Sequence, residues 1–282
     1  MRASRRELQQ RAESLLMAVA ASDRPPSGAD WERAAAEYRR LVPSASADTV
    51  DHRALTACRL PDGGVALPAA VSLLRLRQAQ RAVPPANLAL FLELLASCDA
   101  AARRAAEPET LAAHAALSAA PLDRLSAARA AVGLCATRHW RLALPLVAAA
   151  RRGGPPPRGA LSALAAAALR AGDDALGWEV LQELAASRLR PADDALDAWL
   201  ERCEARARAE SRLALRAGCL DDQQKDVTRA DESAERMVQR LLEFLADSGA
   251  MLSELQALRL RDICTQRLAR PWAGQATQVS SR

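Results

Sequence analysis

Histidine and cysteine are the residues of this chain that most often carry catalysis or bind metal ions. The three histidines, His52, His114 and His139, are far apart in the sequence, and none has a motif partner. The sequence also lacks a phosphate-binding glycine loop and a G-x-S-x-G nucleophile. We therefore expect no enzymatic activity, no metal or other cofactor and no small-molecule substrate.

The six cysteines are spread singly along the chain: Cys58, Cys98, Cys135, Cys203, Cys219 and Cys264. No two of them have the C-x-x-C spacing of a zinc or redox site. Isolated thiols in a helical protein are usually small packing residues, so we predict that they lie in the core. A chain of this length does not need disulfides, and a reducing compartment fits best.

Arginine is the remaining source of chemistry, because its guanidinium group binds phosphate. Seven arginines fall at expected helix ends and loops: Arg59, Arg151, Arg152, Arg158, Arg170, Arg188 and Arg190. They are candidates for contacts with RNA phosphates. The alternative is that they form ordinary solvated surface.

Composition predicts an all-α protein. Alanine and leucine dominate the apolar half of the 282 residues, aromatics make up 3%, and Ile263 is the single isoleucine. Strong helix formers are therefore abundant and strand formers scarce. The formal charge of +5 permits an anionic partner. Lys225 is the only lysine, however, which is typical of a GC-rich genome and weakens that argument.

The elements that must position these arginines recur along the chain. Turn prolines at Pro84, Pro121, Pro157 and Pro191 are separated by 37, 36 and 34 residues. Such a period indicates stacked helical hairpins, since one hairpin cannot bury its own apolar faces. We expect an α-solenoid of antiparallel helical hairpins with a joint at each proline.

The clearest unit covers residues 158–192. Its first helix carries apolar residues at helical spacing and should end at Gly172, where a positive φ is needed. Asp173 and Asp174 then begin the second helix, where carboxylates cap backbone N–H groups. The second helix should end before Pro191.

Residues 158–192 resemble a pentatricopeptide repeat, with Ala171 and Gly172 at the central turn and an Arg-x-Arg-Pro ending, residues 188–191. The resemblance is best over residues 124–192 and degenerate elsewhere. Tetratricopeptide repeats are a similar family of helical hairpins, but their Trp, Tyr and Pro pattern is not visible in any unit of this sequence. The resemblance implies RNA binding in an organelle, with one base read per repeat.

The base-reading positions that the resemblance implies do not carry the expected residues. The pairs are Leu55 with Pro85, Leu92 with Leu122, Ala128 with Arg158, and Ser162 with Ala192. Only Ser162 keeps a hydroxyl group, so we include it among the candidate RNA contacts. Leucine, proline and alanine side chains make no hydrogen bonds to a base edge, and we expect contacts independent of RNA sequence.

We divide the chain into four parts: an N-terminal helical hairpin (1–46), four pentatricopeptide-like repeats (47–192), C-terminal closing helices (193–270) and a mobile tail (271–282). The arginine-rich first helix is either retained or a mitochondrial targeting segment; Glu7 and Glu13 favour the first reading. No apolar run reaches the roughly 18 residues of a membrane span.

These features predict a non-catalytic component of a ribonucleoprotein assembly, for example the mitochondrial ribosome. Its partners would be RNA and neighbouring proteins. The alternative is a helical adaptor that binds only proteins in another organellar complex. The expected location is mitochondrial, with another organelle or the cytoplasm as alternatives.

Overall fold

The computed structural model describes residues 4–152, 154, 157–217, 233–249 and 251–268. The described residues are helical, with no strand among them and one isolated β-bridge between Arg59 and Val65. The prediction of an all-α protein is therefore confirmed. The expected tail at 271–282 lies outside the described residues.

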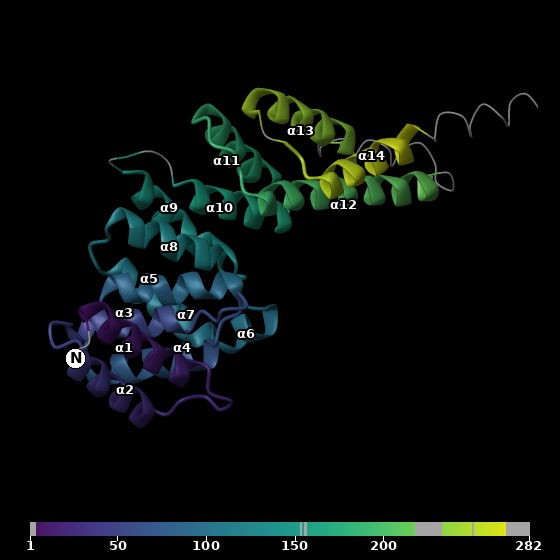
Figure 1. Ribbon diagram of the computed structural model, residues 1–282. Helices are drawn as coiled ribbons and strands as arrows, with labels where there is room; N and C mark the ends of the chain where they lie inside the picture. The colour runs from purple at the N-terminus through teal and green to yellow at the C-terminus, as the bar shows by residue number, and fades with distance from the viewer. Residues whose placement is uncertain (1–3, 153, 155–156, 218–232, 250, 269–282) are drawn as a thin grey trace, which may run out of the picture. The chain divides into compact units, whose positions relative to one another are not determined.

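The chain divides into two compact units, residues 1–160 and 161–282. The first unit contains these helices, including two 3₁₀ helices (Figure 1): α1 (Arg5–Ala20), α2 (Gly28–Leu41), α3 (Ala47–Ala57), α4 (Leu67–Gln80), α5 (Pro85–Leu94), η1 (Leu95–Ser97), α6 (Ala100–Ala105), α7 (Glu107–Ser118), α8 (Arg124–Cys135), η2 (Trp140–Ala143) and α9 (Leu144–Arg151). Helix α10 (Arg158–Arg170) begins in the first unit and continues into the second, which further contains α11 (Asp174–Ala186), α12 (Asp193–Ala217), α13 (Ala234–Ser248) and α14 (Glu254–Leu268).

Local sequence signals explain where most of these helices begin. The N-cap side chains that accept a hydrogen bond from a backbone N–H of the first turn are Ser4, Ser27, Ser46, Asp99, Asp123, Asp173, Ser233 and Ser253. Each such cap contributes about 1 kcal/mol to helix stability. Helix α14 has a reciprocal cap of Ser253 with Gln256 three residues later, since each side chain accepts from the other residue's backbone N–H.

The turn prolines lie between helices. Pro84 is the N-cap of α5, and Pro121 lies between α7 and α8. Pro157 directly precedes α10, and Pro191 lies between α11 and α12. The stretch from 88 to 122 contains the additional short helix α6.

Helices of the first unit contact one another in chain order. Helix α1 packs on α3, α3 on α5, and α5 on α8, while α2 packs on α4 and α4 on α7 (Figure 1). The α5–α8 contact is the most extensive, and Gly133 brings α8 against the backbone of α5. A Cβ atom at Gly133 would lie 1.8 Å from the carbonyl oxygen of Leu92.

The core of each unit is made of leucine, alanine and a few aromatic residues. Trp31, Tyr38 and Phe91 are fully buried in the first unit. In the second unit Trp199 is buried with its ring 5.4 Å from that of Trp178, and its indole N–H donates to the carbonyl oxygen of Met237. These tryptophans pack between helices.

Gly172 has a φ of +83°, and the prediction that this turn needs a positive φ is confirmed. The Asp173 side chain accepts a hydrogen bond from the Leu176 N–H at 3.3 Å and caps α11. Residues with side chains other than glycine rarely adopt this conformation, which explains the glycine between α10 and α11.

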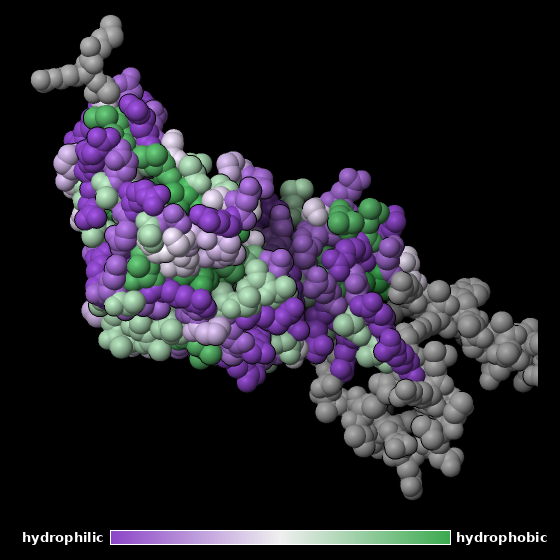
Figure 2. Space-filling model, turned by 90° about the horizontal axis from the view of Figure 1, so that it is seen from below, coloured by the Kyte–Doolittle hydropathy of each residue, from purple (hydrophilic) through white to green (hydrophobic). Residues whose placement is uncertain are grey.

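The surface is mostly hydrophilic, with hydrophobic areas between the polar residues on the face in Figure 2. The exposed large apolar side chains are spread over several helices: Leu15, Met17, Leu111, Leu125, Leu144, Leu242, Leu255 and Leu258, together with Met251 before α14. None of the helices in the described part of the chain has both the length and the apolar character needed to cross a membrane.

Candidate functional site

The positive charge of this protein is concentrated in one segment. Residues 124–172 contain eight arginines and no aspartate or glutamate. The whole chain has 39 basic and 34 acidic residues. The residues outside this segment therefore include 31 basic and 34 acidic ones and have a formal charge of −3. A general arginine bias would spread the excess along the chain, so this distribution marks the α8–α9 hairpin and the residues that follow it as a candidate anion-binding surface.

One end of this hairpin forms a basic joint, which we define as Arg124, Arg151, Arg152 and Arg158. The Arg124 Nε–H donates to the carbonyl oxygen of Ala150 at 2.9 Å, which ties the start of α8 to the end of α9. Arg151, Arg152 and Arg158 are exposed. Cations are favoured at a helix C-terminus, where backbone carbonyls carry partial negative charge.

The other predicted arginines are mostly paired with carboxylates. Arg59 contacts Glu93 at 2.8 Å. Arg170 contacts Asp194 at 2.5 Å and Glu201 at 3.3 Å. The Asp194 contact raises the pKa of Arg170.

Arg188 and Arg190 follow the end of α11. Arg190 donates to the Met251 carbonyl oxygen at 3.0 Å and lies 3.7 Å from Asp193. Arg188 is exposed, has a φ of +53° and forms no ion pair with any described residue. These two arginines belong to the second unit, and the basic joint belongs to the first.

Ser162 is not on the surface. Its side chain is buried, and its hydroxyl oxygen accepts a hydrogen bond from the Ala192 backbone N–H at 3.0 Å. Leu55 and Leu92, two of the other implied base-reading residues, are also buried. We therefore leave Ser162 out of the candidate surface.

At the opposite end of α8 lies a feature that the sequence reasoning missed. A solvent-open hollow of about 200 Å³ is lined by Arg103, Arg104, Arg138, His139 and Glu107, together with Ala100, Thr110, Ala136 and Thr137. We call it the turn hollow, because α6 and the α8–η2 turn form its walls. Arg103 and Arg104 form no ion pair with any described residue.

Glu107 is the one carboxylate that lines the turn hollow. Its Oε1 accepts from Arg138 Nε at 2.8 Å and from Arg138 Nη2 at 2.5 Å, and it also contacts His139 Nε2. The Arg138 guanidinium, followed by the His139 ring, lowers the pKa of Glu107. His139 therefore contacts a carboxylate.

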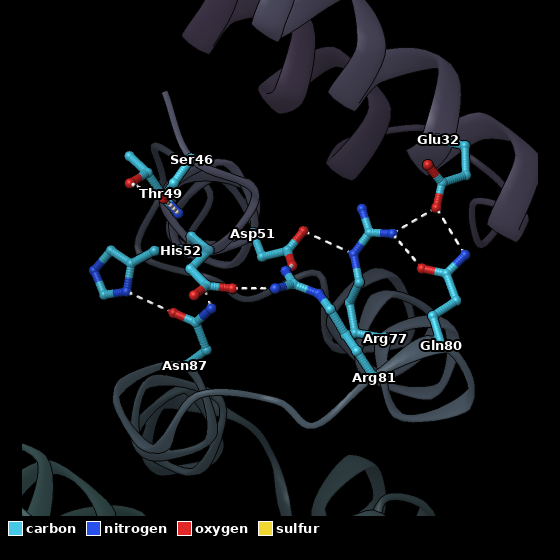
Figure 3. Close-up of polar contacts among 10 residues, drawn as sticks. Glu32, Ser46, Thr49, Asp51, His52, Arg77, Gln80, Arg81 and Asn87 are labelled. Atoms are coloured by element: carbon cyan, nitrogen blue, oxygen red, sulfur yellow. Dashed lines mark hydrogen bonds and ion pairs between the residues drawn. The ribbon is translucent and has the colours of Figure 1, made fainter. Parts of the chain in front are cut away.

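A second polar cluster joins the first helices of the chain (Figure 3). Asp51 of α3 is buried and accepts from Arg77 Nε at 2.8 Å and from Arg81 Nη2 at 2.6 Å. Arg77 also donates to Glu32 of α2 at 2.5 Å. His52 Nδ1 lies 3.0 Å from the Asn87 side-chain oxygen. Because each charged group faces an opposite charge, this cluster acts as a cross-link between α2, α3 and α4.

The cysteines follow in part the prediction that they lie in the core. Cys58, Cys135 and Cys203 are buried, as predicted, whereas Cys98 and Cys264 are half-buried and Cys219 lies outside the described residues. Burial raises the pKa of Cys58 and of Cys135 to about 12. The described residues contain no group of three His, Cys, Asp or Glu side chains that could hold a metal ion.

The signal that the sequence reasoning missed is the absence of acids from residues 124–172. Arg138 lies in that segment, but Arg103 and Arg104 do not, and only the packing of α6 beside the α8–η2 turn brings the three together.

Comparison with known proteins offers no further guide, since no protein-family model and no curated protein matches the chain.

Proposed function

We propose that this protein is a non-catalytic helical-repeat component of a ribonucleoprotein assembly, which contacts RNA phosphates without reading base sequence. The observation that carries the proposal is the acid-free segment of 49 residues, which holds eight arginines in a chain that is otherwise net negative. Arginine is the side chain best suited to phosphate contacts, and such contacts do not distinguish bases. The predicted organellar location, for example in the mitochondrial ribosome, is part of the same proposal.

The architecture we propose is an α-solenoid of pentatricopeptide-like hairpins. Contacts between equivalent places in successive hairpins support it, because a stacked repeat joins residues one period apart. His52 and Asn87 are 35 residues apart, Arg75 and Glu109 are 34 apart, and Arg138 and Glu107 are 31 apart. The order of packing, α1 on α3, α3 on α5 and α5 on α8, also supports it.

Sequence-independent binding follows from the residues at the implied reading positions. The Leu55 and Leu92 side chains are buried and apolar, and the Ser162 hydroxyl is bonded to the backbone of Ala192. These groups offer no hydrogen bond to a base. The basic joint, in contrast, presents exposed guanidinium groups to which any RNA strand can bring a phosphate.

The proposal is tested by the salt dependence of RNA affinity. Each phosphate contact to a single strand contributes about 0.7 to the slope of log affinity against log salt. Replacing Arg151, Arg152 and Arg158 with glutamine should reduce the slope by roughly 2. The matched control replaces Arg5, Arg6 and Arg11, which are exposed on α1, and should leave the slope close to that of the wild type.

Fluorescence anisotropy with several single-stranded RNAs of equal length would supply these slopes. Equal slopes for the two triple variants would contradict binding by the basic joint, and a strong preference for one RNA would contradict sequence independence. The substitutions are on the surface and should each change the unfolding free energy by less than about 0.5 kcal/mol. Far-UV circular dichroism would check this.

The alternative, a protein-only adaptor, is supported by a separate observation. Met251, just before α14, and Leu255 and Leu258, in the first turns of α14, are exposed, with 74%, 68% and 40% of their surface accessible. Large apolar groups exposed close together in the sequence are suited to contact with another protein. Absence of RNA affinity at low salt, together with copurification of protein partners after RNase treatment, would favour this function.

A further inference from the structure

The turn hollow has the charge and dimensions of a site for a single anionic group. Its lining side chains include three guanidinium groups and one carboxylate, which gives a formal charge of +2 before any protonation of His139. A volume of about 200 Å³ is several times the roughly 30 Å³ share of one water molecule, so a tetrahedral oxyanion fits with its hydration.

The arginines of the turn hollow are held in two ways. Arg138 is fixed by the Glu107 carboxylate, with Nε–H and Nη2 donating to Oε1 at 2.8 and 2.5 Å. A guanidinium group that donates to one carboxylate keeps further N–H donors for a second acceptor. Arg103 and Arg104, in the last turn of α6, have no ion-pair partner among the described residues. Their side chains are therefore available to a ligand.

We propose that the turn hollow binds a phosphomonoester dianion, such as the terminal phosphate of an RNA strand or free inorganic phosphate. A dianion neutralises the +2 charge of the lining, whereas the monoanionic phosphodiester of an internal nucleotide leaves it half neutralised. Charge-assisted hydrogen bonds from guanidinium to phosphate oxygens would hold the group from both walls. This site is separate from the basic joint and does not require that the joint bind RNA.

The experiment compares two short single-stranded RNAs of identical sequence, one with a 5′-phosphate and one with a 5′-hydroxyl end. Fluorescence anisotropy with the full-length protein should show about tenfold tighter binding of the phosphorylated RNA, since one hydrogen bond to a charged group contributes about one decade of affinity. The variant Arg103→Gln/Arg104→Gln should lose this preference.

The chain offers a matched control for that variant. Arg39 and Arg40 are also two consecutive arginines in the last turn of a helix of the first unit; both are exposed, and Arg40 contacts Glu37 at 2.6 Å. Arg39→Gln/Arg40→Gln removes the same charge but should keep the preference for the 5′-phosphate. Both variants should melt within a few degrees of the wild type, because the replaced side chains are exposed or, for Arg103, half-buried.

Addition of inorganic phosphate distinguishes the two sources of the group. Loss of the preference at millimolar phosphate supports a site for the phosphoryl group in general. A preference that survives supports a site that takes the group only as the end of a strand. Equal affinity of the wild type for the two RNAs would overturn the proposal. So would an equal loss of the 5′-phosphate preference in the two double variants. Neither result would affect the salt-slope test of the basic joint, so the two proposals fail separately.

Discussion

Replacing Gly133 with alanine tests how closely α5 and α8 must approach. The added Cβ would lie 1.8 Å from the carbonyl oxygen of Leu92 and 2.8 Å from the backbone nitrogen of Glu93. Contacts under 3.0 Å are essentially never seen for Cβ atoms, so the helices must separate by at least about 1.2 Å. The obstacle is backbone, and no side-chain rotation can relieve it.

The free energy of this separation can be set against the gain from alanine. Alanine is favoured over glycine inside a helix by about 1 kcal/mol. A gap of 0.5–1 Å already forfeits a quarter to a half of each van der Waals contact, and overpacking a core costs about 1–3 kcal/mol, sometimes more. Because α5 and α8 share the most extensive contact in the first unit, we expect Gly133→Ala to lower the unfolding free energy by about 2–4 kcal/mol.

Two other glycines provide a graded series for the same substitution. At Gly177 the new Cβ would lie 2.6 Å from the Leu169 side chain, which can move, so the loss should be smaller. At Gly159 no atom lies within 4 Å, and alanine should stabilise the helix by up to about 1 kcal/mol. Urea unfolding followed by circular dichroism would rank the three substitutions by their effect on the unfolding free energy. If Gly133→Ala unfolds at the wild-type urea concentration, the α5–α8 packing described above is wrong.

Three further predictions concern the buried and charged groups. Cys58 and Cys135 should react with a thiol reagent at pH 8 only after unfolding, since burial raises the pKa of both to about 12, and rapid labelling in the native state would refute this. Asp51→Asn should cost about 3 kcal/mol, because it removes the charge of a buried carboxylate that pairs with the buried guanidinium group of Arg77 and with half-buried Arg81, whereas Asp48→Asn, at an exposed pair, should cost under about 1 kcal/mol in urea titrations. The pKa of Glu107 is lowered in the folded protein, so its contacts should stabilise the protein above about pH 4.3 and lose that contribution as the pH falls further. The stability difference between wild type and Glu107→Gln should therefore shrink in acid, and a difference that grows would contradict this assignment.

Features set by neighbouring residues were predictable from the sequence. The start of α11 at Asp173 and the positive φ of Gly172 depend on groups within a few positions, so the pattern of Gly-Asp-Asp was sufficient. The cap of α14 by Ser253 and Gln256 is of the same kind. In each case the controlling interaction is a hydrogen bond or a backbone preference inside one turn.

Features set by packing were not predictable in this way. Ser162 was a candidate because it keeps a hydroxyl group at an implied base-reading position, but residues 160–169 of α10 are almost all buried, and no outward face remains there. The turn hollow depends on two turns about 35 residues apart in sequence. Its arginines could be found from the sequence only if the depth and angle of the stacking between hairpins were known in advance.

The charge of the α8–α9 hairpin is not explained by the stability of the fold. Glu93 and Glu107, from the preceding hairpin, pair with Arg129 and Arg138, so part of the charge is balanced within the first unit. Arg152 has no ion pair with any described residue and follows directly on another arginine.

The basic joint gathers like charges at the surface, where mutual repulsion opposes folding and leucine and alanine packing provides the stability. A segment of 49 residues without one acid therefore carries a cost that the core does not require. An anion that binds at this surface would offset the repulsion. We accordingly expect phosphate or RNA to raise the melting temperature of the wild type more than that of a variant with glutamine in place of the joint arginines.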